Sequence, residues 1–130
     1  MTDMKNILQI SEIEEIKNNE WVILSTSNNN KPRSIVVIPS KVESDKMILS
    51  NIQMSKTFDN LKQNPNCFIN VYIKSNNDKQ YKIECECEIF DNGELFYEIK
   101  TYEEENNLPE ELKVHSIIVA KYKNIEISEG

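Results

Sequence analysis

Apolar positions along the chain follow two different periods, and their order predicts a β-rich domain with three helices. Runs rich in β-branched and other apolar residues predict six strands, at 21–27, 33–39, 46–51, 67–74, 81–90 and 114–128. Apolar residues at a spacing of three to four predict helices at 10–19, 55–64 and 93–106. We expect Ser11 and Glu14 to form a capping box, and Ser55 to cap the second helix.

Most of the predicted strands are joined by short polar turns, which favours antiparallel pairing over crossover connections. The segment Asn28–Pro32 has the composition of a hairpin loop although it contains no glycine. A six-stranded antiparallel split β-barrel, closed or partly split, would remove the edges that an open sheet exposes. We therefore expect a single domain over residues 1–130, with a helical segment at 1–19 and a barrel with inserted helices at 20–128.

The charge balance limits the partners that the domain can have. The chain has 15 Lys+Arg and 22 Asp+Glu, a net charge of −7, so it should repel nucleic acid and anionic membranes. The amino-terminal segment resembles no signal peptide, and no apolar run approaches the roughly 20 residues that span a bilayer. We expect a cytoplasmic protein whose three cysteines are free thiols.

Several kinds of chemistry lack the residues that they need. With only two glycines, Gly93 and Gly130, the chain has no glycine-rich loop of the dinucleotide-binding or P-loop type. His115 is the only histidine, and we expect it to be a structural strand residue rather than part of a zinc site or a triad. We therefore expect no metal site and no catalytic acid, base or nucleophile.

The strand at 81–90 carries two further groups with alternative interpretations. Cys85 and Cys87 would lie on one face, where they could serve metal or redox chemistry or simply pack in the core. The opposite face carries three glutamates that could bind a cation or form a solvated surface: Glu84, Glu86 and Glu88. We favour core packing for the thiols and solvation for the carboxylates.

The basic residues provide the remaining chemical signal. Arg33 is the only arginine among the 15 cationic residues, and guanidinium binds phosphate in a bidentate manner that lysine does not reproduce. The segment Ser55-Lys56-Thr57 brings hydroxyls, free N–H groups and an ammonium to a helix start, where the dipole already disfavours a cation. This combination suits a dianionic phosphate, although solvated side chains are an alternative for each residue alone.

The order of these segments resembles the pyridoxamine 5′-phosphate oxidase-like family, the FMN-binding split barrels. The resemblance covers residues 21–89 and is most specific in SKTFDNLKQNP, the segment that enters the second helix and ends in Asn-Pro. It implies a homodimer with FMN at its interface and a small-molecule or electron-carrier substrate. The residues at the positions that hold the FMN phosphate in this family are Arg33, Ser55, Lys56 and Thr57.

The same resemblance implies which residues surround the flavin ring. Those at the ring-lining positions of the second strand are Ser34, Ile35 and Val36. Ser50 and Asn51, which close the third strand, stand where the family contacts the flavin through backbone and hydroxyl groups. The resemblance thus implies a small flavin-dependent oxidoreductase in which the cofactor carries out the electron transfer.

The sequence also departs from the family in two places. There is no second arginine, so the Arg-x-His pair of the vitamin B6 oxidases is absent and oxidation of pyridoxamine phosphate is not expected. Val37 and Ile38 are apolar where a second basic residue often occurs. The alternatives are therefore a module that binds or senses FMN without turnover, or a split barrel that uses another cofactor such as a deazaflavin or haem.

Overall fold

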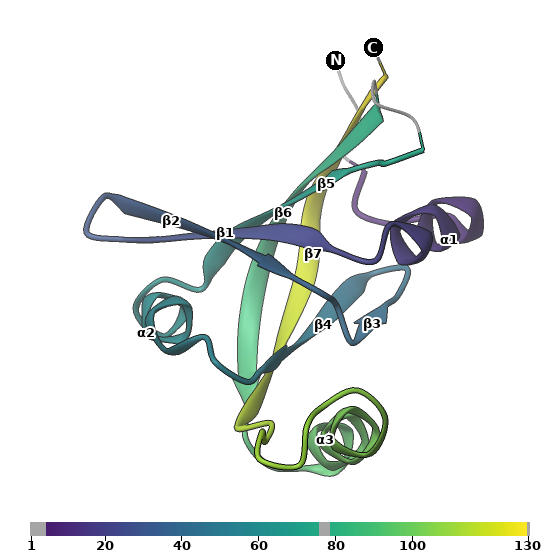
Figure 1. Cartoon of the computed structure of the whole chain (residues 1–130). Helices are drawn as coiled ribbons and strands as arrows, with labels where there is room; N and C mark the ends of the chain where they lie inside the picture. Colours follow the sequence, from purple (N-terminus) through teal and green to yellow (C-terminus); the bar gives the residue numbers. More distant parts are fainter. Residues whose placement is uncertain (1–4, 76–78, 130) are drawn as a thin grey trace.

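In the part of the chain that the structure describes, seven strands pair in a single antiparallel sheet in the order β2-β1-β5-β6-β7-β4-β3 (Figure 1). The structure is a computed structural model that describes residues 5–75 and 79–129. Its strands are β1 (Val22–Asn28), β2 (Lys31–Val37), β3 (Lys41–Val42), β4 (Lys46–Asn51), β5 (Asn66–Tyr72), β6 (Lys79–Phe90) and β7 (Ser116–Glu129). Its helices are α1 (Ile10–Asn19), α2 (Ser55–Gln63) and α3 (Glu94–Asn106). The predicted mainly β fold with flanking helices is confirmed.

The predicted strand count and the predicted barrel closure both need correction. The sheet has seven strands instead of six, because Lys41 and Val42 pair with Ile48 and Met47 to form the two-residue strand β3. A strand this short shows no alternation of its own, so the sequence does not predict it. In the described part of the chain β2 and β3 are the two edges of the sheet, so it stays open rather than closing into a barrel.

The hairpin between β1 and β2 forms without a glycine, as its composition predicts. Asn28 pairs with Lys31, and the two loop residues Asn29 and Asn30 have φ values of 53° and 61°. Asparagine tolerates this left-handed conformation better than most residues do, and two such residues in succession match the right-handed twist of the strands. The hairpin therefore directs Arg33, three residues after the loop, along a fixed edge strand.

All three predicted helices are present, but their starts differ from the predicted capping patterns. The backbone N–H of Gln9 donates to the carboxylate of Glu12 at 2.8 Å, so the capping interaction lies two residues before the predicted Ser11–Glu14 pair. Helix α2 begins at Ser55, and the preceding Met54 offers no side-chain cap. None of the helices in the described part of the chain is long and apolar enough to cross a bilayer.

The curved sheet surrounds one main hydrophobic core. Every strand contributes at least one buried apolar residue to this core, and Leu61 of α2 and Ile16 of α1 close it from two sides. On β6 the inward residues from Tyr81 to Cys87 are buried and the intervening ones face outward, as the alternation predicts. A smaller cluster lies on the outer face of β4 and β7, where it packs α3 through Phe96 and Ile99.

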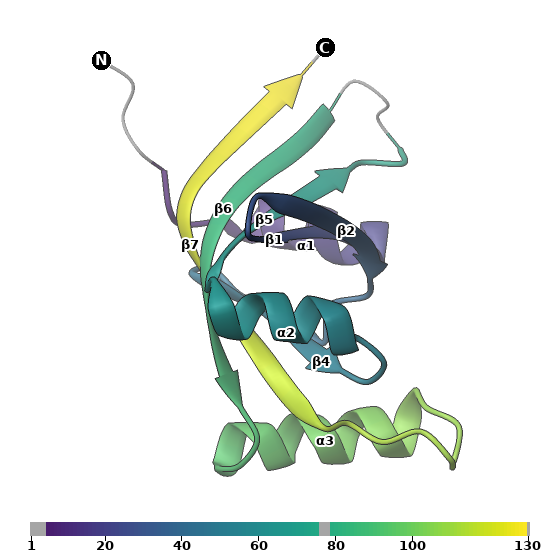
Figure 2. The same cartoon turned by 90° about the vertical axis from the view of Figure 1, so that its left-hand side faces the viewer.

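The helices lie in separate regions around the sheet. Helix α2 runs alongside the β1–β2 hairpin in both views, and Asn60 of α2 donates to the Thr26 hydroxyl of β1 at 3.2 Å. Helix α3 lies at one end of the molecule and the far end of β7 at the other (Figures 1 and 2). Five of the nine predicted site residues line grooves in this region: Arg33, Ile35, Val36, Ser50 and Lys56.

Helix α1 is tied to β6 by a polar network that buries part of Glu15. The hydroxyl of Tyr81 and the ammonium of Lys79 both donate to the same carboxylate oxygen, the latter at 2.8 Å. Burial opposes ionisation of Glu15, but these two hydrogen bonds and the Lys79 charge outweigh it and hold its pKa below the usual range. The carboxylate therefore stabilises the fold in its ionised form.

We expect a Glu15→Gln variant to be destabilised by about 1–2 kcal/mol at pH 7, because each hydrogen bond to a charged group is worth roughly that much when partly exposed. The difference from the unmodified protein should shrink as the pH falls below the unfolded pKa of about 4.5 and through the lower folded value. Urea unfolding at pH 7 and pH 3 measures the loss of stability and its dependence on pH. The matched control is Glu14→Gln, which changes an exposed carboxylate of the same helix; an equal loss in both variants would contradict the role of Glu15.

Candidate functional site

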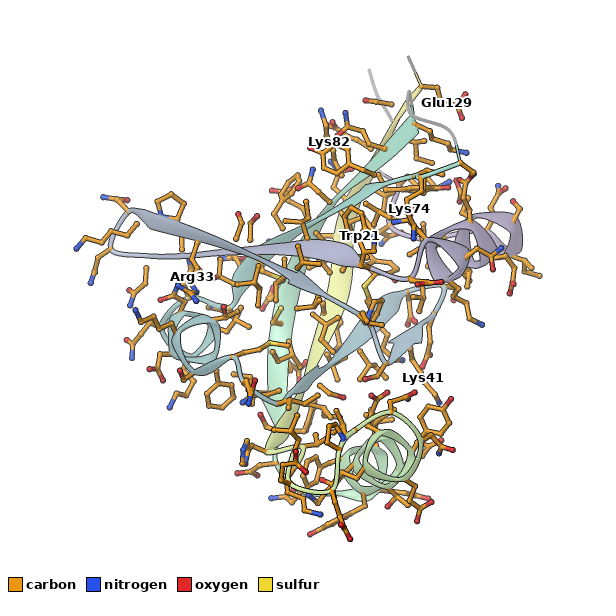
Figure 3. The ribbon with its side chains drawn as sticks, in the orientation of Figure 1. Trp21, Arg33, Lys41, Lys74, Lys82 and Glu129 are labelled. Carbon is orange, nitrogen blue, oxygen red and sulfur yellow. The ribbon has the colours of Figure 1, made fainter. Side chains whose placement is uncertain are left out.

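Arg33 and the start of α2 lie together, although they are far apart in the sequence. Figure 3 shows Arg33 extending from β2 toward α2, and its Nε donates to the Thr57 hydroxyl at 3.4 Å. Thr57 is 1% exposed, so its hydroxyl is fixed in place, whereas Arg33 and Lys56 are exposed. The guanidinium is thus oriented by a buried residue while most of its donors remain free for a ligand.

A groove of about 430 Å³ opens between the β1–β2 hairpin and α2. We call it the basic groove, and its lining residues are Asn28, Asn29, Lys31, Pro32, Arg33, Lys56, Asp59 and Asn60. The lining contains three cations, three amides and one carboxylate. This carboxylate, Asp59, lies within 3.8 Å of the ammonium of Lys62. The groove is therefore locally positive in a protein with a net charge of −7. Lys31 belongs to it but was not among the predicted site residues.

The first turn of α2 adds hydrogen-bond donors to this positive region. The helix has no acidic residue in its first turn and no side-chain cap, so its first N–H groups are not neutralised by the chain itself. Ser55 and Lys56 are both exposed there. Ser55 is the first helical residue rather than the cap, which leaves its hydroxyl available. A helix start with these features favours an anion.

A second groove, of about 730 Å³, adjoins the other part of β2. We call it the apolar groove, and its lining residues are Ile35, Val36, Val37, Ile38, Pro39, Ser40, Ser50, Ile52, Gln53, Met54, Tyr102, Glu103, Asn107, Leu108 and Leu112. Val36 on β2 and Ile38 directly after it are 67% and 73% exposed, so both leave apolar surface open to solvent beside this groove. The two grooves adjoin, because β2 lines the basic groove through Arg33 and the apolar groove through Ile35. The start of α2 likewise lines the basic groove through Lys56 and the apolar groove through Met54.

The two grooves together have the features of a site for an elongated ligand with an anionic end. Residues two apart on a strand are separated by roughly 7 Å, so a single small molecule can reach from Ile35 to Arg33. A flat apolar body would lie against Ile35, Val36 and Met54, while its anionic end meets Arg33 and Lys56. Sites of this kind combine an apolar wall with a few oriented polar groups.

The predicted ring-contacting residues occupy different environments. Ile35, Val36 and Ser50 line the apolar groove, and the Ser50 hydroxyl bonds that of Ser40 at 2.6 Å. Ser34 lines neither groove; its hydroxyl bonds that of Ser25 on the neighbouring strand at 2.8 Å. The structure thus brings most of the predicted residues to one place and directs Ser34 elsewhere.

Asn51 is buried, and its polar atoms are used within the protein. Its Nδ2 donates to the Ser116 hydroxyl at 3.0 Å, and its Oδ1 accepts from the Met54 N–H at 3.4 Å. Its backbone carbonyl accepts from the N–H of His115 at 2.9 Å. These contacts hold the turn between β4 and α2 against the start of β7, so Asn51 fixes the position from which Ser55 and Lys56 are presented.

His115 lies immediately before β7 with an exposed side chain, not within a strand as predicted. The sequence predicted no site residue in α3 or in the loop that follows it, yet this segment lines the apolar groove through Tyr102, Glu103, Asn107, Leu108 and Leu112. No local pattern marks them, because only the packing of α3 against β4 and β7 brings this segment beside β2.

The cysteines converge on the inner face of β5 and β6. Cys67 is paired in register with Cys85, and its sulfur lies 2.8 Å from that of Cys87. Contact with Cys85 and burial raise the pKa of Cys67, and contact with Cys67 together with burial raises that of Cys87. Thiols that stay protonated are poor nucleophiles, so their environment is that of core residues. The outward Glu84, Glu86 and Glu88 are exposed, as expected.

Comparisons with known proteins identify the fold but no sequence relative. No family model matches the chain, and no curated protein matches it in sequence. HupZ of Group A Streptococcus is 12% identical, with a TM-score of 0.79 over 95% of this chain and 99% of HupZ. A Clostridium acetobutylicum protein related to general stress protein 26, of the pyridoxinephosphate oxidase family, is 14% identical, with a TM-score of 0.74 over 92% of this chain and 87% of that protein.

A third solved structure is an FMN-binding protein from Syntrophomonas wolfei subsp. wolfei. It is 22% identical, with a TM-score of 0.69 over 88% of this chain and 82% of that protein. The chain has the pyridoxamine 5′-phosphate oxidase-like fold. The resemblance predicted from the sequence is thereby confirmed at the level of the fold, and the strands that this fold arranges are those that line the two grooves.

Proposed function

We propose that this chain is a pyridoxamine 5′-phosphate oxidase-like flavoprotein that binds FMN and works as a small flavin-dependent oxidoreductase. The observation that carries the proposal is that Arg33 and Lys56 line one groove at the uncapped start of α2. A phosphate dianion there would meet two cations, the Ser55 hydroxyl and free helix N–H groups. The apolar groove begins two residues along β2, where the flavin ring would lie.

The residues present fit FMN in their chemistry as well as their position. Bound FMN would supply the electron transfer, and the chain would bind, orient and shield it. Ile35, Val36 and Met54 would exclude water from one face of the ring. The Ser50 hydroxyl, held by Ser40, would offer a fixed hydrogen bond at its edge. This division of roles requires no catalytic acid or base from the chain.

We propose in addition that the protein is a cytoplasmic homodimer with the cofactor at the interface. Strand β2 is an edge of the sheet in the described part of the chain, and Val36 of this strand and Ile38 directly after it are exposed. Exposed apolar edge strands are prone to pairing with another chain. A second copy placed over β2 would bury these residues and enclose the apolar groove. Light scattering of the purified protein measures its mass, and a monomer that binds FMN would contradict this part of the proposal.

The visible spectrum of the purified protein, followed by mass spectrometry of the ligand released on denaturation, tests the cofactor. We expect FMN at up to one molecule per chain after incubation with it. Release of a deazaflavin or of haem would contradict the assignment of FMN. Anaerobic mixing with NADH or NADPH then separates an enzyme from a binding module: bleaching no faster than that of free FMN would count against an oxidoreductase that uses these donors.

A further inference from the structure

The side of the apolar groove that is formed by α3 carries a negative charge. Among the described residues that line the apolar groove, Glu103 is the only charged one. Its side chain is half-buried and makes no hydrogen bond or ion pair with any residue in 5–75 or 79–129. A carboxylate left without a partner beside an apolar surface is a strong local source of negative potential.

The carboxyl end of α3 reinforces this charge. Glu103 lies in the last turn of the helix, which contains no basic residue, and Asn107 caps its end. The helix dipole places a partial negative charge at this end, where cations are favoured. The neighbouring Glu104 is neutralised by Lys100 and Lys113, and Glu98 pairs with Lys41 at 3.5 Å. Glu103 is therefore the acidic residue of this wall whose charge is directed to the groove.

The other groove residues on this wall suit the body of a small organic cation. Tyr102 is 55% exposed and lines the groove next to Glu103, so its ring face is available to a cation or an aromatic group. Leu108 and Leu112 add apolar surface. In residues 5–75 and 79–129, no lysine, arginine or histidine lines this groove to attract an anion.

We propose that the apolar groove admits a small organic cation with an apolar or aromatic body, and that Glu103 is the residue that selects its charge. If the groove also holds the flavin ring, as the proposed function requires, the substrate that reaches the ring is a cation of this class. Anionic substrates would then be bound at a disadvantage, because they would meet Glu103 and the negative end of α3. The protein would thus use opposite charges for two purposes, a positive groove for the cofactor phosphate and a negative wall for the substrate.

Two aromatic probes of similar size and opposite charge test the proposal: phenyltrimethylammonium and benzenesulfonate. Their affinities are measured by ligand-observed NMR titration on the full chain, with and without FMN, at low ionic strength. We expect the cation to bind roughly tenfold more tightly than the anion, since one favourable charge contact corresponds to about that factor. Glu103→Gln should bring the ratio close to one, and Glu103→Lys should reverse it.

The matched control is Glu105→Gln, which removes the same charge from an exposed position of α3 that lines neither groove. It should leave the ratio unchanged. A ratio that Glu103→Gln does not alter, or that Glu105→Gln alters equally, would overturn the proposal. FMN binding is measured separately from the visible spectrum: failure to bind FMN with a Glu103-dependent preference intact would refute the proposed function alone, and normal FMN binding without that preference would refute this inference alone.

Discussion

Replacing Arg33 and Lys56 together with alanine is expected to weaken FMN binding by roughly two to four orders of magnitude. Each charged side chain would donate a charge-assisted hydrogen bond to the phosphate, worth about 1.5–3 kcal/mol, so losing both costs about 3–6 kcal/mol of binding free energy. Both side chains are exposed, so the fold should be retained. Quenching of flavin fluorescence on titration measures the affinity, and urea unfolding verifies the stability.

Lys62→Ala provides the matched control for this experiment. Lys62 also lies on α2 and is also exposed, but it lies over the ring of Phe58 and does not line the basic groove. Its removal takes away one positive charge, as each of the two substitutions in the double variant does, and should change FMN affinity by less than threefold. If Lys62→Ala weakens binding as much as the double variant does, the effect arises from overall charge, and the basic groove is not the phosphate site.

The salt dependence of binding provides a second check on the same site. Contacts between charges in a groove open to solvent are screened as ionic strength rises. The unmodified protein should therefore lose FMN affinity with added salt, and the Arg33→Ala, Lys56→Ala variant should lose much less.

The parts of the fold that were predictable from the sequence are those with a local signal. The alternation in β6 extends over several residues, so its buried face could be assigned, and the helical spacing in 55–64 predicted the helix α2. The Asn-rich hairpin was recognisable because asparagine supplies the left-handed backbone that a two-residue loop needs. Strand β3 was missed because two residues show no period.

The residues of the candidate site also divide into those that the sequence indicates and those that depend on packing. Arg33 and the start of α2 stood out because one is the single arginine and the other places a lysine where a helix start disfavours it. That Arg33 reaches Thr57 follows from the way α2 packs against β1, which no local pattern specifies. Glu103 and Tyr102 could not be predicted at all, because their place in the apolar groove depends on the packing of α3 against the outer face of β4 and β7.

Asn51 illustrates how structure changes the interpretation of a residue, and it leads to the second large expected effect. The family resemblance places Asn51 in contact with the flavin, whereas its contacts in the structure are with Ser116, Met54 and His115. Asn51→Ala should leave a Ser116 hydroxyl buried at 2% exposure without that partner, and the Met54 N–H without an acceptor. Each such loss costs about 1–3 kcal/mol, so we expect destabilisation by roughly 2–6 kcal/mol in urea unfolding.

FMN affinity distinguishes these two roles of Asn51. If the residue fixes the turn that presents Ser55 and Lys56, Asn51→Ala should lower stability strongly and FMN affinity by no more than about tenfold. The double variant Asn51→Ala, Ser116→Ala should be less destabilised than the sum of the two single variants, because it removes both partners of one hydrogen bond. A variant that keeps its stability within about 0.5 kcal/mol but no longer binds FMN would contradict this role and favour direct contact with the flavin. Asn51 would then contact the flavin directly, and its hydrogen bonds to Ser116, Met54 and His115 would be secondary to that contact.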